Sequence, residues 1–307
     1  MAEVTAALVK ELRDTTGAGM MDCKKALVQC EGDMQKAIDY LRENGLSKAA
    51  KKAGRIAAEG LVRLAFNADA TKAAAVEVNI ETDFASKNPE FIEFVEDLAK
   101  ISLSDEVKCE NCLLKQDYKG EGTVQEALTQ KIAKIGENMS VRRVAKCTTE
   151  GVKYVGYLHM GGKIGVIVGL KTDASADEVA VCGKDVAMQV ASMNPQFVDE
   201  SAIDPEYIEH EKEVLIAQAA KEAPEKPQAI IEKMIQGRLK KQLKETCLVD
   251  QAFVKDSNMS VAEYVASVAK QLGKDIKVVE MIRYEVGEGI EKKQENFAEE
   301  VAKQMAQ

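Results

Sequence analysis

EGLVRL at residues 59–64 has a near copy, EGVKYV, at residues 150–155. Each copy runs through a turn into a second apolar stretch, VEVNI at residues 76–80 and VIVGL at residues 166–170. These stretches have the alternation and the β-branched residues that are typical of strands. The offset between the copies stays at 90 to 91 residues, so we predict two copies of a β-hairpin.

A turn and an amphipathic helix are expected after each hairpin. Thr-Asp stands two residues beyond each second strand, at residues 82–83 and 172–173. Asn88-Pro89 then supplies an N-cap and a proline suited to the first helical position. The residues with helical spacing are Phe91, Phe94, Leu98 and Ile101 in the first copy, and Val181, Val186, Ala187 and Val190 in the second. Another helix is expected between Thr123 and Gly136, which makes the fold class α+β.

Three short helices are predicted before the first copy, as a small bundle. Gly32-Asp33 provides a turn and an N-cap for the third helix, and Asn44-Gly45 is expected to end it. The basic stretch from Ser47 to Arg55 either continues as a helix or forms a linker. Contact with nucleic acid is the alternative, but no aromatic side chain lies nearby for base stacking, so we favour a solvated segment.

A charged helical hairpin is predicted from residue 204 to residue 245. Asp204-Pro205 opens its first helix, and APEKP at residues 223–227 separates the two helices. The pair is expected to protrude as an antiparallel coiled coil, packed on itself or on a second chain, and we favour the first. A helix over residues 261–272, a strand over residues 277–286 and an acidic C-terminal helix should follow.

The composition excludes several classes of protein. Its 307 residues suggest two domains or three small ones, and the net charge of −9 argues against binding a phosphate backbone. The two histidines, His159 and His210, are too few for a three-histidine zinc site. The N-terminus has acidic residues and no long apolar stretch, and the longest apolar run, Ile164–Leu170, is too short to cross a membrane. We expect a cytoplasmic protein with reduced thiols and no membrane partner.

The candidates for bond chemistry are weak. Residues 156–163, GYLHMGGK, miss the phosphate-binding loop because the lysine is one place late and Ile164 replaces the Ser or Thr, so we predict a hairpin turn. The pair Cys109 and Cys112 has no further ligands for zinc; we favour incidental thiols over a redox-active dithiol. His159 at a hairpin tip and His210 on a charged helix have no nucleophile beside them. We expect no enzyme, no cofactor and no resident metal.

One residue breaks the similarity of the two copies. The first copy reads Thr82-Asp83-Phe84-Ala85, whereas the second has Ala174 where the first has Phe84. Phe84 either folds back into its own core or is an apolar anchor that inserts into another protein.

Four motifs along the chain resemble those of a known family. They are TGAGMMDCKKAL at residues 16–27, TDFASKN at 82–88, AKIGEN at 133–138 with Arg142-Arg143 behind it, and RYEVGEG at 283–289. In this order they resemble the elongation factor Ts family of bacteria, over the length of the chain. The resemblance implies a guanine-nucleotide exchange factor, which binds elongation factor Tu with GDP, displaces Mg²⁺ and GDP, and stabilises the nucleotide-free state. The main rival is a protein-binding adaptor or scaffold without exchange activity.

The resemblance also implies a domain plan and a set of contacts. The turn Thr82-Asp83-Phe84-Ala85 would bind elongation factor Tu and dislocate its Mg²⁺: Phe84 would wedge between helices of the partner while Asp83 disturbs the Mg²⁺ and phosphate site. The other implied contacts are Met20, Met21, Lys24, Ile135, Gly136 and His159; the glycine-rich turn after His159 departs from the family pattern and leaves its pose open. The implied domains are a three-helix module similar to ubiquitin-associated domains (1–54), core subdomain N (55–145), core subdomain C (146–203 and 230–263), the inserted coiled coil (204–245) and a C-terminal module (264–307).

Overall fold

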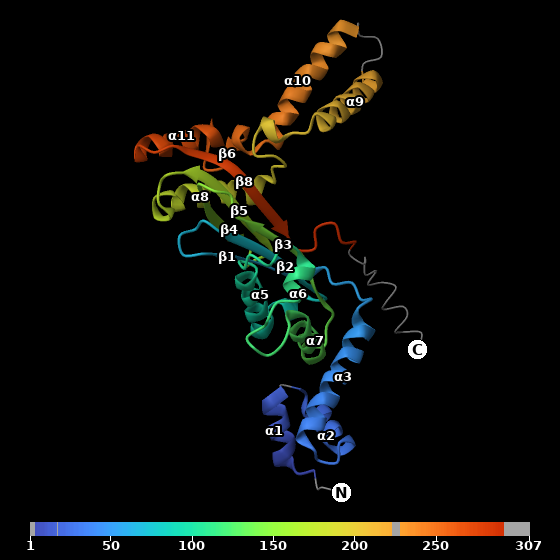
Figure 1. Cartoon of the computed structure of the whole chain (residues 1–307). Coiled ribbons are helices and arrows are strands. Elements are labelled where there is room, and N and C mark those ends of the chain that lie inside the picture. The colour runs from blue at the N-terminus through green and yellow to red at the C-terminus, as the bar shows by residue number, and fades with distance from the viewer. Residues whose placement is uncertain (1–3, 17, 223–227, 292–307) are drawn as a thin grey trace. The chain divides into compact units, whose positions relative to one another are not determined.

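The computed structural model describes residues 4–16, 18–222 and 228–291 (Figure 1). The described residues form both helices and small sheets, which confirms the predicted α+β class. The chain divides into two compact units, which are described separately below. The first comprises Met1–Arg63, Val76–Ala145 and Glu285–Gln307, and the second comprises Leu64–Ala75 and Lys146–Tyr284. The predicted acidic C-terminal helix and the 223–227 break lie outside the described residues.

Three helices begin the first unit: α1 (Ala6–Thr16), α2 (Met20–Gln29) and α3 (Met34–Lys52). Asp33 caps α3 as predicted, because its carboxylate accepts a hydrogen bond from the backbone N–H of Lys36 at 3.1 Å. The buried residues that the three helices share are Val9, Leu12, Cys23, Ala26, Leu27 and Ala37.

Helix α3 does not end at Asn44-Gly45, so that prediction was wrong. The helix continues through the basic stretch to Lys52, and Gly45 is buried within it. A Cβ atom at Gly45 would lie 3.7 Å from the Cβ of Ala133, on α7 (Val124–Ile135). Gly45 thus lies where α3 packs on α7, and this packing outweighs the low helix propensity of glycine.

The first sheet contains β1 (Glu59–Phe66), β2 (Ala73–Ile80) and β3 (Met139–Cys147), in the order β1-β2-β3. Every residue of β2 is buried. The segment between β2 and β3 forms α4 (Asp83–Ser86), α5 (Pro89–Ile101), α6 (Glu110–Leu114) and α7. Asn88 caps α5 as predicted, through a 2.9 Å hydrogen bond from the N–H of Glu90. Phe91, Phe94 and Leu98 are fully buried on α5, in agreement with the predicted stripe.

Strand β3 was not predicted, because Arg142 and Arg143 interrupt its apolar pattern. Both guanidinium groups pair with the carboxylate of Glu77, whose side chain is fully buried on β2, and Arg143 also pairs with Glu288. Arg142 Nη1 lies 3.1 Å from Glu77 Oε1, and Arg143 Nε donates to Glu77 Oε2. The backbone N–H of Gly287 donates to the same carboxylate at 2.9 Å. One buried carboxylate thus links two neighbouring strands and the segment that follows β8 (Ile276–Glu285).

The second unit contains β4 (Val152–His159), β5 (Ile164–Thr172) and β8, in the order β4-β5-β8. Strands β4 and β5 are antiparallel, with Val152 opposite Lys171 and His159 opposite Ile164. This pairing confirms the predicted hairpin and contradicts a phosphate-binding loop at its tip. Val166, Val168 and Leu170 pack into a core with α8 (Ala176–Met193) and α11 (Val261–Leu272).

Helix α8 lies against β4 and β5. Val186, Ala187 and Val190 are buried on it as predicted, whereas Val181 is 70% exposed. The prediction for Val181 was wrong because Val179 and Cys182 face the core instead. A Cβ atom at Gly183 would lie 2.5 Å from Cγ2 of Val155, so this glycine permits the close approach of α8 to β4.

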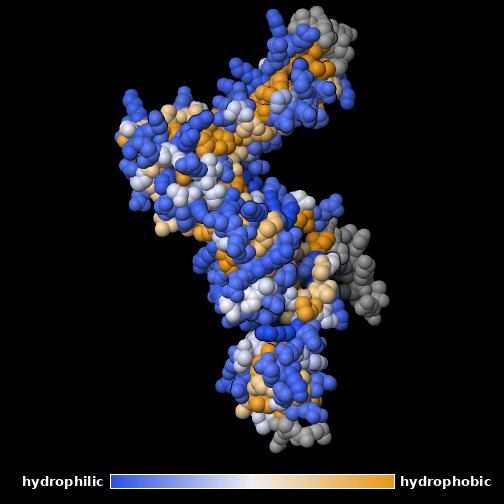
Figure 2. Space-filling model, in the orientation of Figure 1, coloured by the Kyte–Doolittle hydropathy of each residue, from blue (hydrophilic) through white to orange (hydrophobic). Residues whose placement is uncertain are grey.

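Two long helices, α9 (Pro205–Glu222) and α10 (Gln228–Thr246), pack on each other. Leu215, Ala219 and Ile235 are their shared buried residues, with Ile231 and Leu239 alongside. In Figure 2 hydrophobic residues run along this pair between hydrophilic side chains. The second unit also contains two 3₁₀ turns, Glu200–Ala202 and Leu248–Asp250. Strands β6 (Ala252–Phe253) and β7 (Asp256–Ser260) form a short two-stranded sheet, which was not predicted from the sequence. In the described residues, none of the helices combines the length and apolarity needed to cross a membrane.

Two helical glycines in the second unit should respond oppositely to alanine. Gly183→Ala is expected to destabilise the protein by about 1 to 3 kcal/mol, because the new methyl group overlaps Val155. Gly237 on α10 is exposed and has no atom within 4 Å of its Cβ position. Gly237→Ala should stabilise by up to about 1 kcal/mol, because alanine is the better helix former. Thermal unfolding followed by circular dichroism checks both; a higher midpoint for Gly183→Ala would contradict the close contact of α8 with β4.

Candidate functional site

The turn after β2 presents Phe84 to solvent. Thr82 caps the short helix α4, because its hydroxyl accepts a 3.2 Å hydrogen bond from the N–H of Ala85. Phe84 is 81% exposed, and the alternative that it folds into its own core is therefore wrong. Exposing a phenylalanine to this extent leaves a large apolar surface in water. The side chain is placed as an anchor for another molecule would be.

Glu137 holds this turn from the other side of the insertion between β2 and β3. The backbone N–H of Thr82 donates to Glu137 Oε2 at 2.9 Å, and its hydroxyl donates to Oε1 at 2.7 Å. Glu137 directly follows Gly136, which ends α7 in the left-handed conformation with φ of 91°. The structure therefore brings two groups of predicted contacts together: the turn at 82–85 and the pair Ile135 and Gly136.

A second set of hydrogen bonds involves the residue before Thr82, Glu81, and the residue after Glu137, Asn138. The N–H of Asn138 donates to Glu81 Oε1 at 2.5 Å, and the Asn138 amide donates to the carbonyl of Arg55 at 2.8 Å. The guanidinium of Arg55 lies 3.6 Å from Glu81 Oε1. These contacts leave the turn little freedom to move relative to residues 137–138.

The charges next to Phe84 are held weakly. Asp83 pairs with Lys87 at 2.8 Å, one helical turn away; the Lys87 side chain is largely exposed and that of Asp83 is half-buried. The ammonium group of Lys87 also lies 5.7 Å from the centre of the Phe84 ring. Ion pairs near the surface contribute about 1 kcal/mol or less, so breaking the pair between Asp83 and Lys87 costs little free energy.

A second exposed apolar group lies on α2. Cys23, Ala26 and Leu27 point into the core of the three helices, which leaves the opposite face of α2 in solvent. Met21 is 64% exposed there, and Met20 and Lys24 are exposed with it. Val28, one turn further along, extends this face and was not among the predicted contacts.

His159 lies at the tip of the β4–β5 hairpin, in the second unit. Its Nδ1 is 2.9 Å from the hydroxyl of Tyr157, and the ring is half-buried. The next residue, Met160, is 73% exposed and has φ of 48°, followed by Gly161 and Gly162, which also have positive φ. The tight turn therefore fixes His159 and projects Met160 beside it. Met160 was not predicted as a contact.

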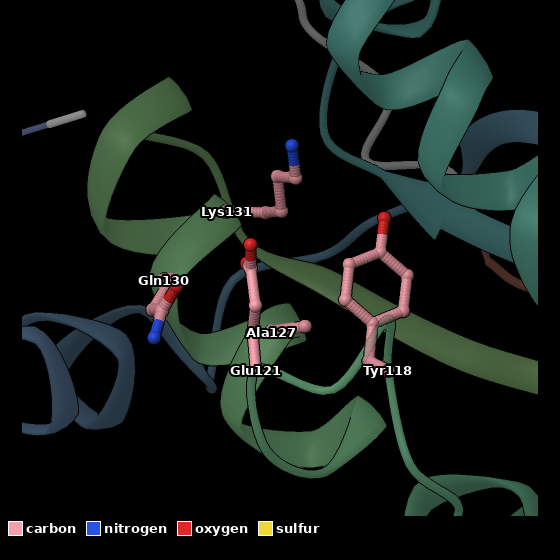
Figure 3. A pocket seen from close by; sticks show the side chains of 5 residues that line it. All are labelled: Tyr118, Glu121, Ala127, Gln130 and Lys131. Atoms are coloured by element: carbon pink, nitrogen blue, oxygen red, sulfur yellow. The ribbon is translucent and has the colours of Figure 1, made fainter. Parts of the chain in front are cut away.

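The cavity in Figure 3 has no features of a nucleotide site. It is lined by Ala127, Gln130 and Lys131 of α7 and by Tyr118 and Glu121 of the preceding loop. Its volume of about 100 Å³ is well below the roughly 300 Å³ of the smallest ligand pockets. Burial, together with the nearby Asp97 carboxylate, raises the pKa of Tyr118 to about 12, so this phenol stays protonated.

Two other predictions about chemistry concern metals and histidines. Among the residues that the structure describes, no cluster of three or more His, Cys, Asp or Glu side chains is arranged to hold a metal ion. His210 is exposed on α9, as expected for a charged helix.

Sequence reasoning missed the residues that position the turn. The motif at residues 133–138 was noticed, but no role was assigned to Glu137 or Asn138. The one sequence feature that points to Glu137 is its position directly after Gly136, the glycine that ends α7. Its counterpart, Thr82, is 55 residues away in the chain, so only the tertiary structure identifies the pair.

The comparisons with known proteins agree with these motifs. A family model described as "Elongation factor TS" matches residues 81–288. Elongation factor Ts of Clostridioides difficile (strain 630) is 56% identical over 305 residues, covering 99% of this chain and 100% of that protein. Elongation factor Ts of Clostridium novyi (strain NT) is 50% identical over 306 residues, covering 99% of each chain. The chain therefore belongs to the elongation factor Ts family.

Proposed function

We propose that this protein is a guanine-nucleotide exchange factor for elongation factor Tu and acts in the cytoplasm during translation. It binds the GDP form, displaces Mg²⁺ and GDP, and stabilises the nucleotide-free state until GTP binds. The observation that carries the proposal is Phe84, 81% exposed on a turn whose backbone is fixed by Glu137. The family membership names the partner, and the exposed ring supplies the means of binding it.

Phe84 is suited to be the anchor of the interface. A buried aromatic side chain contributes more to binding than most other residues, and such anchors dominate the energy of protein interfaces. The turn is already ordered by four hydrogen bonds, from Thr82 to Glu137, from Ala85 to Thr82 and from Asn138 to Glu81. Because little further ordering is needed, little of the binding energy is lost to conformational entropy.

Asp83 is the residue that we propose discriminates between nucleotide states. Mg²⁺ is the main counter-charge of a bound diphosphate, and it prefers oxygen ligands in near-ideal octahedral geometry. A carboxylate inserted nearby disturbs those ligands and repels the phosphates. If the factor binds the empty partner more tightly than the GDP form, linkage requires that it weaken GDP binding by the same ratio. This role involves no making or breaking of covalent bonds.

Further residues are proposed as additional contacts with elongation factor Tu. On α2 these are Met20, Met21 and Lys24, and on the β4–β5 hairpin His159. Ile135 and Gly136 contact the partner beside the Phe84 turn. The exposure of Met20, Met21 and Lys24 supports their assignment. His159, Ile135 and Gly136 are half-buried, and the resemblance to the family supports theirs.

We also propose the domain plan that the resemblance implies. Residues 1–54 form a module like ubiquitin-associated domains, supported by the shared core of α1, α2 and α3. Residues 55–145, and 146–203 with 230–263, form the duplicated core, and residues 264–307 form the C-terminal module. Residues 204–245 form an antiparallel coiled coil within one chain, since Leu215, Ala219 and Ile235 bury one another there.

Phe84→Ala tests the anchor. We expect GDP release, followed with fluorescent GDP on elongation factor Tu, to be slower by about 30-fold or more, because removing such an anchor costs about 2 kcal/mol or more. The thermal midpoint should not change, because the side chain makes few contacts within the chain. Val254→Ala, which truncates another exposed apolar residue away from the proposed contacts, is the matched control. Undiminished release with Phe84→Ala would remove the anchor role.

Glu137→Ala tests the positioning of the turn. Loss of the two hydrogen bonds from Thr82 should slow exchange by about tenfold or more, since even one hydrogen bond to a charged group contributes about 1.5 kcal/mol. Glu137→Gln keeps one acceptor oxygen and should restore part of the rate. Glu93→Ala, which breaks only a surface ion pair with Lys119, should leave exchange unchanged. Equal rates for wild type and Glu137→Ala would contradict this positioning.

Asp83→Asn tests the discrimination and separates exchange from simple binding. The variant should keep its affinity for nucleotide-free elongation factor Tu but lose several-fold in the ratio of affinities for the empty and GDP forms. Calorimetric titration of each form measures that ratio. Wild-type protein that binds elongation factor Tu without accelerating GDP release would instead support the adaptor alternative.

A further inference from the structure

Two cysteine side chains meet at the start of α6. The Sγ atoms of Cys109 and Cys112 are 2.7 Å apart. Cys109 is the N-cap residue of α6, and its sulfur accepts a 3.3 Å hydrogen bond from the backbone N–H of Cys112. Both thiols are free and both side chains are half-buried. The sequence alone favoured two incidental thiols, and the short separation of the sulfurs is what departs from that interpretation.

The separation is close to that of a covalent bond. A disulfide is about 2.05 Å long, so closure requires the two sulfurs to approach by only about 0.7 Å. The hydrogen bond from the backbone N–H of Cys112 holds the Cys109 sulfur beside residue 112. A single turn of backbone links the two residues.

The environment of this pair differs from that of the buried cysteines. The hydrogen bond from the Cys109 thiol lowers the pKa of Cys112, and backbone groups and the Lys115 ammonium act in the same direction. Burial raises the pKa of Cys182 to about 11 and that of Cys247 to about 11. Because the thiolate is the reactive form, Cys112 should react well before these two residues.

We propose that Cys109 and Cys112 form a thiol–disulfide exchange site that small disulfides oxidise reversibly. The thiolate of Cys112 attacks one sulfur of the disulfide, forms a mixed disulfide and releases one thiol. Cys109 then loses its proton and attacks Sγ of Cys112, which closes the Cys109–Cys112 bond and releases the second thiol. The pair loses two electrons and two protons, and the small disulfide gains both. This site does not depend on the proposed exchange of nucleotides.

The experiment treats the full chain with oxidised glutathione and measures intact mass and free thiols. We expect a product lighter by two hydrogen atoms, with five of the seven thiols still free and no bound glutathione. Peptide mapping should place the new bond between Cys109 and Cys112, and dithiothreitol should reverse it. A chain that keeps all seven thiols, or that holds glutathione on either residue without closing, would overturn the proposal.

Single variants distinguish formation of the Cys109–Cys112 disulfide from simple accessibility of one thiol to glutathione. Cys109→Ser leaves Cys112 without its resolving thiol, so the variant should accumulate one glutathione on Cys112. Cys30→Ser removes a half-buried cysteine elsewhere and should leave the closure unchanged. Circular dichroism before treatment verifies that both variants are folded. Closure in Cys109→Ser through any other cysteine would contradict the assignment of the pair.

Discussion

A single buried carboxylate, that of Glu77, fixes the part of the first unit from which the candidate site extends. It lies on β2 with no solvent exposure and is neutralised by Arg142 and Arg143 of β3. Removing one member of such a buried group leaves uncompensated charge, at a cost of about 3 to 5 kcal/mol. The same carboxylate accepts the N–H of Gly287, and Arg143 donates to the carbonyl of Glu285 at 2.7 Å. These contacts thus fix β2, β3 and the segment after β8 relative to one another.

The pairing of β2 with β3 determines which residues meet just beyond the two strands. Strand β2 ends at Ile80 and β3 begins at Met139, so Glu81 and Thr82 leave the sheet where Glu137 and Asn138 enter it. The resulting hydrogen bonds from Thr82 and Asn138 fix the turn that carries Phe84. An exposed aromatic side chain is therefore supported by charge pairing inside the sheet, through a chain of neighbouring contacts.

Local signals in the sequence predicted the elements whose partners are close in the chain. The caps at Asp33 and Asn88, and the β4–β5 hairpin with its glycine turn, are of this kind. The sequence failed where a distant partner decides the structure. Strand β3 was missed because Arg142 is paired with a residue 65 positions away, and α3 was ended too early because the packing of Gly45 on Ala133 was invisible.

The candidate site follows the same division. Phe84 stood out because the two copies of the repeat differ there, but Glu137 did not, since its role depends on Thr82, which is remote in sequence. The backbone behind each exposed apolar side chain is fixed by different local contacts. Hydrogen bonds to Glu137 fix the turn that carries Phe84, and the buried face of α2 fixes the helix that carries Met21. Met160 lies in a turn with three positive φ angles. A side chain on fixed backbone loses little conformational entropy when it binds, so these contacts make the apolar surface more effective for association. Residue type reveals which side chains are apolar, whereas their value for binding depends on contacts that hold the backbone behind them.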